Sequence, residues 1–370
     1  MLSANLSGKY GWIIYHEHLF GKHRLRNHLL PSLSINNNHI AVVNFFSESH
    51  NATNDMIAIN GAIYKRWILP FTYKLQNSSD LIFDHSNIAN VSDESVYFMD
   101  AASIIVGCLL KVNIDSTILD FCSAPGGKSL ILIRRILETI CFDNDLNHLK
   151  CKVICNEFNR SRLERLRKVL LNHIGELNMQ KLNVKTVSVD AASNSASFYF
   201  TNKFLNIIVD APCSSDRHLI LSNTLQNWSL KLSKENHRRQ VNILINSLNL
   251  LESNGTILYC TCTLNKKEND DTIEYICKKA SINPELCLLS LFSILSDFKN
   301  IHNQVKISIQ PLSENYRQDN KKIPECEFAD SELEIKEYNT IIFEYSKFGA
   351  YILPDKNNGI GPLYVSIINK

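Results

Sequence analysis

The sequence predicts an α/β protein whose core is a doubly wound, mostly parallel sheet with an antiparallel C-terminal hairpin, preceded by an N-terminal extension. Continuous apolar runs such as Phe204–Val209 are typical of strands buried on both faces of a parallel sheet. From Tyr97 onward such runs alternate with segments of helical length and spacing. The chain ends with two short apolar runs, Tyr351–Leu353 and Leu363–Ile368, whose turn-rich connection predicts the hairpin.

Composition is that of an ordinary globular protein and limits the partners that the chain can attract. Of its 370 residues 45% are hydrophobic and 21% are charged, and the formal net charge is +2. With so small a charge, affinity for nucleic acid has to come from local basic clusters. No apolar run approaches the roughly 20 residues of a membrane span, so we expect no membrane association.

Cysteine usage indicates a reducing compartment. The eleven cysteines are an odd number without regular spacing, whereas disulfide frameworks belong to short secreted chains. The pairs Cys151/Cys155 and Cys260/Cys262 are close enough in sequence to suggest a metal, but no second pair or neighbouring histidine completes a ligand set. The sequence therefore predicts no metal site.

We expect an N-terminal extension at residues 1–95 and a larger domain at 96–370. Residues 1–46 carry several basic residues and one acid, Glu17, which favours either a mitochondrial transit segment or a basic arm of the mature protein. Residues 47–95 are polar and rich in Asn and Ser, and they allow no firm assignment of fold. Residues 285–345 are expected to form a long, irregular insertion with a charged middle.

Within the larger domain, helices and strands are predicted to alternate. In such a sheet the ligand crevice lies beyond the carboxyl ends of the strands, so chemistry is expected there. The expected order is a helix at 99–110, a strand at 116–121, a loop at 122–129 opening a helix to about 139, a strand at 153–155, a helix with Leu163, Leu166, Leu170 and Leu171 on one face, strands at 184–189 and 204–209, a helix at 233–251 ended by Asn254-Gly255, a strand leading to Tyr259, and a polar helix near 268–279.

A glycine-containing loop connects the first strand of this domain to its helix. Gly126 and Gly127 let the backbone approach a ligand closely, and the helix that follows presents unpaired N–H groups. Gly127-Lys128-Ser129 resembles the end of a Walker A motif, but that motif needs glycine where this chain has Cys122, which argues against nucleoside triphosphate chemistry. A purely structural strand-to-helix turn is the alternative.

Three acidic residues follow successive predicted strands: Glu157, Asp190 and Asp210. An acid after the second strand of a doubly wound sheet usually accepts hydrogen bonds from a ribose, which suits Glu157. Asp190 then suits an adenine amino group, and Asp210 is expected near the reacting end. A single acid at a strand end is most often a solvated loop residue, but three behind a glycine loop favour a cofactor that contains a nucleoside.

Two cysteines are expected at the same edge of the sheet. Cys213 follows Pro212 directly after the strand that ends at Asp210, and Cys262 follows the strand that leads to Tyr259. An exposed thiol beside a cation tends toward the thiolate, and Arg217 or Lys128 can supply that charge. Lone cysteines are usually packing residues, so either Cys260 or Cys262 alone also fits the core.

Three motifs together carry a resemblance to a known family. Phe121–Lys128 (FCSAPGGK), Asp210–Arg217 (DAPCSSDR) and Tyr259–Thr263 (YCTCT) resemble the Sun-domain (Nop/Sun, Fmu-like) RNA cytosine-5 methyltransferases. The resemblance extends from about Tyr97 to the C-terminus and includes the closing Gly361–Tyr364. It is closest to the mitochondrial members, especially those that act on small-subunit rRNA, and it implies a Rossmann-like, class I S-adenosylmethionine-dependent methyltransferase.

The resemblance also implies roles for individual residues. Cys262 is the implied nucleophile, Cys213 assists proton loss at carbon 5 and release of the adduct, and Asp210 hydrogen-bonds the base. S-adenosylmethionine is the implied cofactor, with Glu157 on its ribose and with Arg162, Asp190 and Asp210 around its nucleoside. The residues implied around its methionine moiety are Cys122, Ser123, Ala124, Pro125, Gly126, Gly127 and Lys128.

The expected function is methyl transfer to carbon 5 of a cytosine in RNA, namely mitochondrial small-subunit rRNA. The alternatives are a mitochondrial tRNA cytosine-5 methyltransferase and a non-catalytic RNA-binding factor of ribosome assembly. The resemblance further suggests the mitochondrial matrix and a protein partner that presents the RNA. Phosphate contacts are expected from Arg217 above all, from residues 1–95, and from the helical basic residues Arg160, Arg162, Arg165, Arg167, Lys168, Lys234, Arg238 and Arg239.

Overall fold

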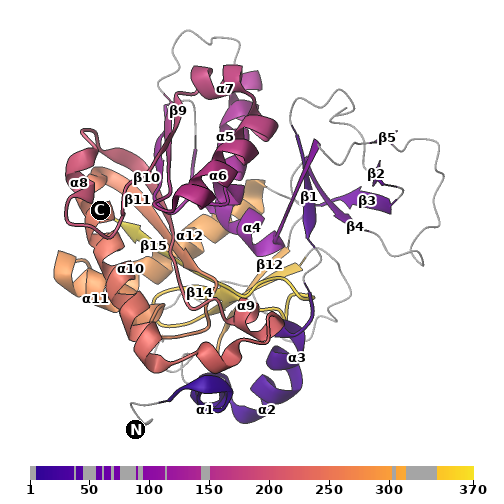
Figure 1. The fold of residues 1–370 in the computed structure, drawn as a ribbon, viewed down its shortest axis with the longest axis vertical. Coiled ribbons are helices and arrows are strands. Elements are labelled where there is room, and N and C mark those ends of the chain that lie inside the picture. Colours follow the sequence, from indigo (N-terminus) through magenta and orange to yellow (C-terminus); the bar gives the residue numbers. More distant parts are fainter. Residues whose placement is uncertain are drawn as a thin grey trace.

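The computed structural model describes residues 6–36, 39–44, 56–60, 62–67, 71–75, 89–90, 95–112, 115–142, 151–301, 306–313 and 340–370. These residues form two sheets, a large one at the centre of the molecule and a small one beside it, with helices packed around the large sheet (Figure 1). Among the described helices, none is both long enough and apolar enough to cross a membrane.

The large sheet has nine strands in the order β12-β13-β14-β15-β11-β10-β7-β8-β9. The five strands from β11 to β9 are mutually parallel, whereas β15 is antiparallel to β11 and to β14. The predicted doubly wound sheet and its C-terminal hairpin are therefore confirmed. The bounds are β7 Thr117–Asp120, β8 Lys152–Asn156, β9 Val184–Val187, β10 Phe204–Asp210, β11 Leu251–Thr261, β14 Ala350–Ile352 and β15 Leu363–Asn369.

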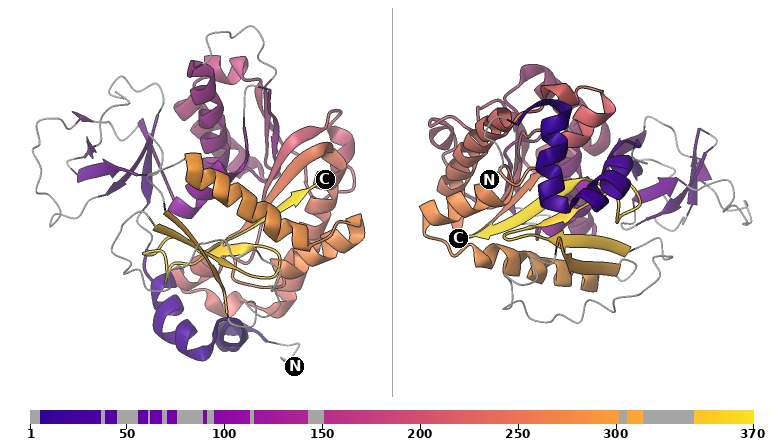
Figure 2. Two further views of the ribbon diagram at one scale, coloured as in Figure 1. Left: turned by 180° about the vertical axis from the view of Figure 1, so that it is seen from behind. Right: turned by 90° about the horizontal axis from the view of Figure 1, so that it is seen from below.

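The expectation of an irregular segment at 285–345 is wrong for its described parts. They form the helix α12 (Glu285–Ile301) and the strands β12 (Lys306–Pro311) and β13 (Thr340–Tyr345), which extend the large sheet. Figure 2 shows α12 crossing one face of this sheet. The helix has the usual apolar spacing, because Leu288, Leu291, Phe292, Leu295 and Phe298 are all buried. Residues 314–339, which include most of the charged middle, lie outside the described residues.

Helices cover both faces of the large sheet and bury two apolar cores. One core joins the sheet to α4, α5, α6 and α12, and the other joins it to α10, α11 and the N-terminal helices. Of the leucines predicted for the buried face of α6, Leu171 is instead 50% exposed. The bounds are α4 Ala101–Leu109, α5 Gly127–Phe142, α6 Arg160–Ile174, α7 Glu176–Lys181, α8 Ala196–Tyr199, α9 Asp216–Leu221, α10 Leu230–Leu250 and α11 Asp270–Ala280.

The end of α10 also differs from the prediction. Asn254-Gly255 does not stop this helix, because β11 already begins at Leu251, and the pair lies inside the strand. Gly255 is required there for packing: a Cβ atom at this position would lie 2.9 Å from the backbone oxygen of Leu205. The sequence signal was real, but it marked a close approach of two strands rather than a helix end.

The N-terminal residues contribute to the second core. The helices α1 (Gly8–Phe20), α2 (Lys22–Arg24) and α3 (Leu30–Leu33), with the π-helical turn η1 (Leu25–Leu29) between α2 and α3, lie against the main domain (Figure 1). Trp12, Leu25, Leu29 and Leu33 are fully buried. Residues 6–36 therefore pack against the main domain and share its second core.

The small sheet was not predicted. It has six strands in the order β5-β2-β3-β4-β1-β6, mostly antiparallel. Arg134 of α5 joins it to the main domain, because its guanidinium lies 3.9 Å from the ring centre of Phe71 and donates to the carbonyl of Val43. The bounds are β1 Ile40–Val43, β2 Met56–Ile59, β3 Ala62–Arg66, β4 Thr72–Leu75, β5 Ala89–Asn90 and β6 Val96–Met99.

Candidate functional site

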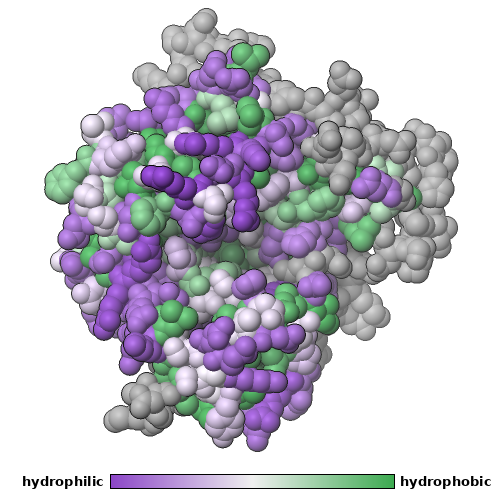
Figure 3. Space-filling model, viewed as in Figure 1, coloured by the Kyte–Doolittle hydropathy of each residue, from purple (hydrophilic) through white to green (hydrophobic). Residues whose placement is uncertain are grey.

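The carboxyl ends of the parallel strands gather the predicted site residues at one edge of the sheet. The glycine loop follows β7, Glu157 follows β8, Asp210 ends β10, and Cys262 follows β11. Figure 3 shows the surface hollowed near the centre of this face, between the regions that Figure 1 labels α6 and α9. The topology therefore places these residues where open α/β sheets bind their ligands.

The two predicted cysteines lie side by side at this edge. The Sγ atoms of Cys213 and Cys262 are 3.3 Å apart, and both residues are half-buried. Ser215 lies between them, with its Oγ 3.3 Å from Cys262 Sγ and 3.7 Å from Cys213 Sγ. Cys260, the alternative core cysteine, is fully buried. The prediction that two sulfurs from neighbouring strands share one site is thus met by the geometry.

The environment favours the thiolate form of Cys262 over that of Cys213. A hydrogen bond from Cys213 lowers the pKa of Cys262, and Ser215 acts in the same direction against the cost of burial. The same contact, together with burial and nearby Glu268, raises the pKa of Cys213 well above its ordinary value. These two shifts favour a protonated Cys213 beside a Cys262 thiolate.

Lys128 and Asp210 form an ion pair beside the cysteines. Lys128 Nζ lies 2.8 Å from Asp210 Oδ2 and also donates to Ser103 Oγ at 3.1 Å. Burial opposes the ammonium charge, yet Asp210 keeps the pKa of Lys128 above its usual range. On its other oxygen Asp210 accepts from Cys260 Sγ at 3.5 Å. Lys128 thus acts on Asp210 directly and on Cys262 as a neighbouring positive charge.

The glycine loop is held in shape by a buried hydroxyl chain. Ser129 Oγ donates to Asp120 Oδ2 at 2.5 Å and lies 2.5 Å from Ser123 Oγ. Gly126 has a φ of +112°, in the left-handed region, and a Cβ there would lie 2.8 Å from Leu166 Cδ1. Burial raises the pKa of Asp120 to about 7, and its Oδ1 has no hydrogen-bond partner. Sequence reasoning did not single out Asp120, although it ends the strand before the loop.

The acids after β8 and β9 are each paired with an arginine. Glu157 Oε1 accepts from the backbone N–H of Asn159 at 2.7 Å, and its Oε2 lies 3.3 Å from Arg162 Nη1. Arg162 also donates to the carbonyl of Ala124 at 2.6 Å, so it ties the glycine loop to Glu157. Asp190 pairs with Arg239 at 2.8 Å. Arg239 was predicted as a phosphate contact, and its place beside Asp190 was missed because α10 is distant in sequence.

The expectation that Arg217 contacts RNA at the rim is wrong. Its side chain is buried and donates to backbone carbonyls of Ser32, Ile35, Gly359 and Gly361. Its Nη1 and Nη2 atoms therefore join the start of the chain to the C-terminal hairpin. The exposed members of the predicted set are Arg160, Arg162, Arg165, Arg167, Lys168, Lys234 and Arg238.

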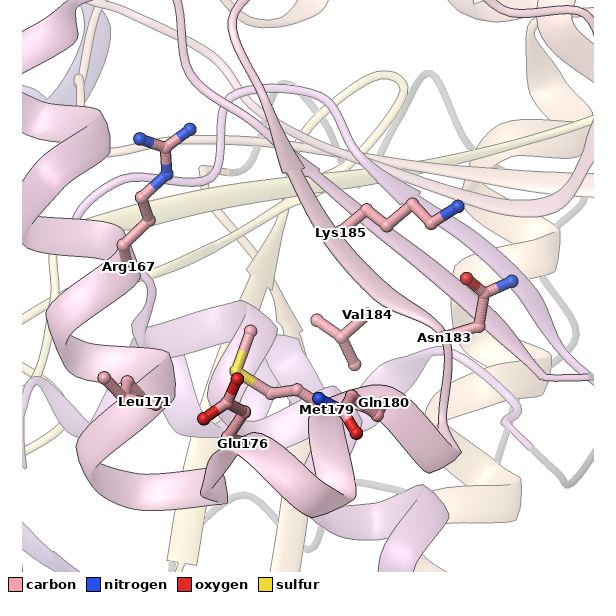
Figure 4. A pocket seen from close by; sticks show the side chains of 8 residues that line it. All are labelled: Arg167, Leu171, Glu176, Met179, Gln180, Asn183, Val184 and Lys185. Carbon is pink, nitrogen blue, oxygen red and sulfur yellow. The ribbon is translucent and has the colours of Figure 1, made fainter.

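A separate pocket of about 580 Å³ opens between α6, α7 and the edge strand β9 (Figure 4). It is lined by Arg167, Leu171, Glu176, Met179, Gln180, Asn183, Val184 and Lys185. Because Val184 begins β9, the pocket lies toward the amino end of the strand, away from the edge that carries the cysteines. It holds none of the predicted catalytic or cofactor residues.

Comparison with known proteins shows which family this chain resembles. Residues 107–320 match the family model described as 16S rRNA methyltransferase RsmB/F. The chain is 28% identical over 277 residues to the 5-cytosine rRNA methyltransferase nsun-4 of Caenorhabditis elegans, covering 73% of this chain and 49% of that protein. It is 24% identical over 276 residues to a mitochondrial tRNA (cytosine(34)-C(5))-methyltransferase of Mus musculus, covering 74% of this chain and 63% of the relative.

Solved structures show the same fold. NSun6 from Pyrococcus horikoshii with SFG, the S-adenosylmethionine analogue sinefungin, matches with a TM-score of 0.58 and 14% identity, covering 97% of each chain. A methyltransferase homologue from Pyrococcus horikoshii matches with a TM-score of 0.56 and 17% identity, covering 96% of this chain and 93% of that one. The chain spans about half to two thirds of the length of the two relatives described above.

Proposed function

The chain belongs to the RsmB/F family of 16S rRNA methyltransferases, and we propose that it transfers a methyl group from S-adenosylmethionine to carbon 5 of a cytosine in RNA. The predicted resemblance is confirmed at the level of the family. One observation carries the proposal: the Sγ atoms of Cys213 and Cys262 lie 3.3 Å apart beside Asp210 and the glycine loop. Pyrimidine methylation at carbon 5 needs a sulfur nucleophile and a second group that completes release.

The residues at the carboxyl edge fit S-adenosylmethionine, the methyl donor of this family. Glu157 offers carboxylate oxygens for ribose hydroxyls, and Asp120 Oδ1 is a buried acceptor without a partner below the loop. When bound, the cofactor supplies an electrophilic methyl group. We assign the methionine part to Cys122–Lys128, the ribose to Glu157, and the nucleoside to Asp190 and Asp210, with Arg162 holding Glu157 and the loop in place.

Cys262 is the proposed nucleophile. Carbon 5 of cytosine is a weak nucleophile, and addition of a thiolate to carbon 6 makes it enamine-like and able to attack an electrophilic methyl group. The lowered pKa of Cys262 supports this role, because it raises the fraction of thiolate at neutral pH. Asp210, held by Lys128, is proposed to accept a hydrogen bond from the N4 amino group of the base, and the positive charge of Lys128 is proposed to offset the negative charge that develops on the ring during attack.

Cys213 is proposed to complete the second stage. After methyl transfer, carbon 5 bears both a hydrogen and the new methyl group, and a base must remove that proton before the bond between carbon 6 and sulfur breaks. The raised pKa of Cys213 keeps it protonated while Cys262 attacks. In the proposed second stage Cys213 first releases this proton to water, and its thiolate then accepts the proton from carbon 5. Loss of the carbon 5 proton then restores the aromatic ring, and Cys262 leaves as a thiolate.

We propose mitochondrial small-subunit rRNA as the substrate and the mitochondrial matrix as the compartment. The rRNA methyltransferase relative and the mitochondrial tRNA relative support this choice. A cytosine stacked in a helix is out of reach of the site, so the target has to be unpaired or flipped out. A partner protein that presents the RNA is part of the proposal. The mitochondrial tRNA relative keeps tRNA as the alternative substrate.

The test is methyl transfer from labelled S-adenosylmethionine to small-subunit rRNA and tRNA of the source organism, with wild type, Cys262→Ala and Cys213→Ala. Cys262→Ala should abolish incorporation, and Cys213→Ala should accumulate a protein–RNA adduct that survives denaturation. Cys151→Ala, a buried cysteine at the opposite end of the strands, is the control and should behave as wild type. Full incorporation by Cys262→Ala refutes the mechanism, and no incorporation by wild type into any RNA favours a non-catalytic RNA-binding factor.

A further inference from the structure

Two loops hold the cysteines, and each carries a buried carboxylate that binds the other loop. The Cys213 loop comprises residues 211–216, from the end of β10 to the first residue of α9, and the Cys262 loop comprises residues 262–269 between β11 and α11. The parallel ladder of β10 and β11 ends at the pair Asp210 and Cys260, and the last backbone bond runs from Ala211 N–H to the carbonyl of Cys260 at 2.9 Å. Beyond that point, other contacts have to set the distance between the loops.

Asp216, at the end of the Cys213 loop, reaches into the Cys262 loop. Its Oδ2 accepts from Thr263 Oγ1 at 2.6 Å and from the backbone N–H of Leu264 at 2.7 Å. Its Oδ1 accepts from Trp12 Nε1 of α1 at 2.6 Å. Asp216, Thr263 and Trp12 are fully buried, so these bonds are made in the absence of competing water.

Glu268, at the end of the Cys262 loop, reaches back into the Cys213 loop. Its Oε2 accepts from the backbone N–H of Ser214 at 3.1 Å, and its Oε1 accepts from Ser214 Oγ. Gln240 Nε2 of α10 donates to Glu268 at 3.0 Å and to the carbonyl of Pro212 at 2.9 Å. Ser214 is the residue directly after Cys213, so the carboxylate acts one residue away from the sulfur.

We propose that Asp216 and Glu268 form a reciprocal carboxylate clasp, a pair of positioning residues that hold the Cys213 and Cys262 sulfurs within reach of one pyrimidine. The inference rests on the proposed function and deepens it, because a two-cysteine reaction requires both sulfurs at one base. Each loop supplies the acceptor for the other, so loss of either carboxylate leaves buried donors unpaired in the opposite loop.

The bonding pattern of Glu268 makes one substitution informative. A glutamine at this position can place its amide oxygen where Oε2 accepts from Ser214 N–H and Gln240, and its NH₂ group where it donates to Ser214 Oγ. Glu268→Gln therefore keeps each contact of the clasp, with the direction of the Ser214 Oγ bond reversed, whereas Glu268→Ala removes them all. Comparison of these two variants therefore separates the positioning role of Glu268 from the effect of its charge.

The test reads the distance between the sulfurs without RNA or methyl transfer. The folded full-length protein carrying Cys277→Ser is treated with diamide, because Cys277 and Cys287 are a second close pair of thiols, 3.5 Å apart. Diamide takes two electrons and two protons from a pair of neighbouring thiols to give a disulfide and the reduced hydrazine. The rate of Cys213–Cys262 disulfide formation is followed by peptide mass spectrometry.

The Cys277→Ser protein and its Glu268→Gln variant should form the Cys213–Cys262 disulfide at similar rates. Glu268→Ala and Asp216→Ala should form it at least tenfold more slowly. Asp270→Ala is the matched control, because Asp270 directly follows the Cys262 loop and is also a buried carboxyl with several donors, but its side chain bonds Ser346, Phe348 and Tyr364 and no residue of either cysteine loop. It should lose stability while keeping the rate.

Ser214→Ala, which removes one hydroxyl and keeps the backbone bond, provides a milder variant where the alanine substitutions at 216 and 268 do not fold. It should slow the disulfide severalfold, and an unchanged rate overturns the clasp. Rapid disulfide formation in folded Glu268→Ala, or failure of Glu268→Gln to retain the rate, also overturns it. The two proposals can fail separately. If the disulfide rates are as expected but the protein methylates no RNA, the clasp stands and the proposed function fails.

Discussion

Lys128 Nζ lies 2.8 Å from Asp210 Oδ2, and this partly buried ion pair joins the glycine loop after β7 to the end of β10. The pair stands next to Cys262, whose thiolate is stabilised by the charge of Lys128 and destabilised by that of Asp210. Removing the cation therefore shifts the equilibrium between thiol and thiolate at Cys262 without changing the cysteine itself.

Lys128→Met should make Cys262 less reactive at neutral pH. Loss of the cation leaves Asp210 as an uncompensated negative neighbour, and an opposite charge nearby is worth roughly 1–3 pKa units. We expect the midpoint of Cys262 alkylation by iodoacetamide to rise by about one pH unit or more, measured by mass spectrometry. Lys185→Met, an exposed lysine on β9, is the control and should leave the midpoint unchanged.

Trp12→Phe should destabilise the protein more than Trp228→Phe does. Both tryptophans are buried, but Trp12 Nε1 donates to Asp216 whereas Trp228 Nε1 has no hydrogen-bond partner. The two substitutions remove the same indole atoms, so their difference reports the bond to a buried carboxylate, about 1.5–3 kcal/mol. Urea denaturation measures it, and equal losses of stability would show that this contact contributes nothing.

Arg24→Ala should destabilise the fold far more than Arg26→Ala. Arg24 binds Glu344 of β13 and Asp355, whose side chains are only 3% and 2% exposed, so its removal leaves two buried carboxylates without their cation. Such a loss costs about 3–5 kcal/mol. Arg26 is 53% exposed in its pair with Glu17, and a surface pair is worth less than about 1 kcal/mol. Thermal unfolding of the two variants checks the contrast.

Glu268→Gln should remove part of the pH dependence of stability. Burial raises the pKa of Glu268 to about 7, above its ordinary 4.5, so the native state holds this proton more tightly than the unfolded state. The resulting stability is present below about pH 4.5 and is lost as the pH rises to about 7, a difference of about 3 kcal/mol. The Glu268→Gln variant cannot titrate at this position, so its free energy of unfolding should rise relative to that of wild type as the pH increases from about 4.5 to about 7.

The measurement is the free energy of unfolding by urea at pH 5 and pH 8 for both proteins. Asp120 titrates in the same range and contributes to the slope of each, so the comparison uses the difference between them. Glu235→Gln, an exposed position on α10, is the control and should follow wild type. Parallel pH profiles for Glu268→Gln and wild type would contradict the prediction.

Local patterns were sufficient for much of the main domain. The strand before Gly126, the strand before Cys213 and the helices between them followed from apolar spacing, because buried strands and amphipathic helices depend on residues close in sequence. The same reasoning missed α12, although its apolar positions repeat at helical spacing, because the charged stretch that follows it in the chain drew the whole region into one irregular segment.

Partners far apart in sequence decided what the patterns left open. Arg217 was expected at the RNA and lies instead among carbonyls of residues 32, 35, 359 and 361. Arg24 was counted with a basic N-terminal arm and lies instead between two acids more than 300 residues away. A basic residue in the sequence carries no information about whether its partner is a phosphate or a buried carboxylate.

By itself the sequence determined the strand–helix alternation, the glycine turn and the placing of Cys213 and Cys262 after neighbouring strands, because each depends on a few consecutive residues and on the regular geometry of a parallel sheet. Only the tertiary structure decided which thiol is the better thiolate and what holds the two sulfurs 3.3 Å apart. Those properties arise from Lys128, Asp216, Glu268 and Trp12, which come together from four separate segments. Burial lowers the effective dielectric around these residues and so strengthens their charge interactions and hydrogen bonds.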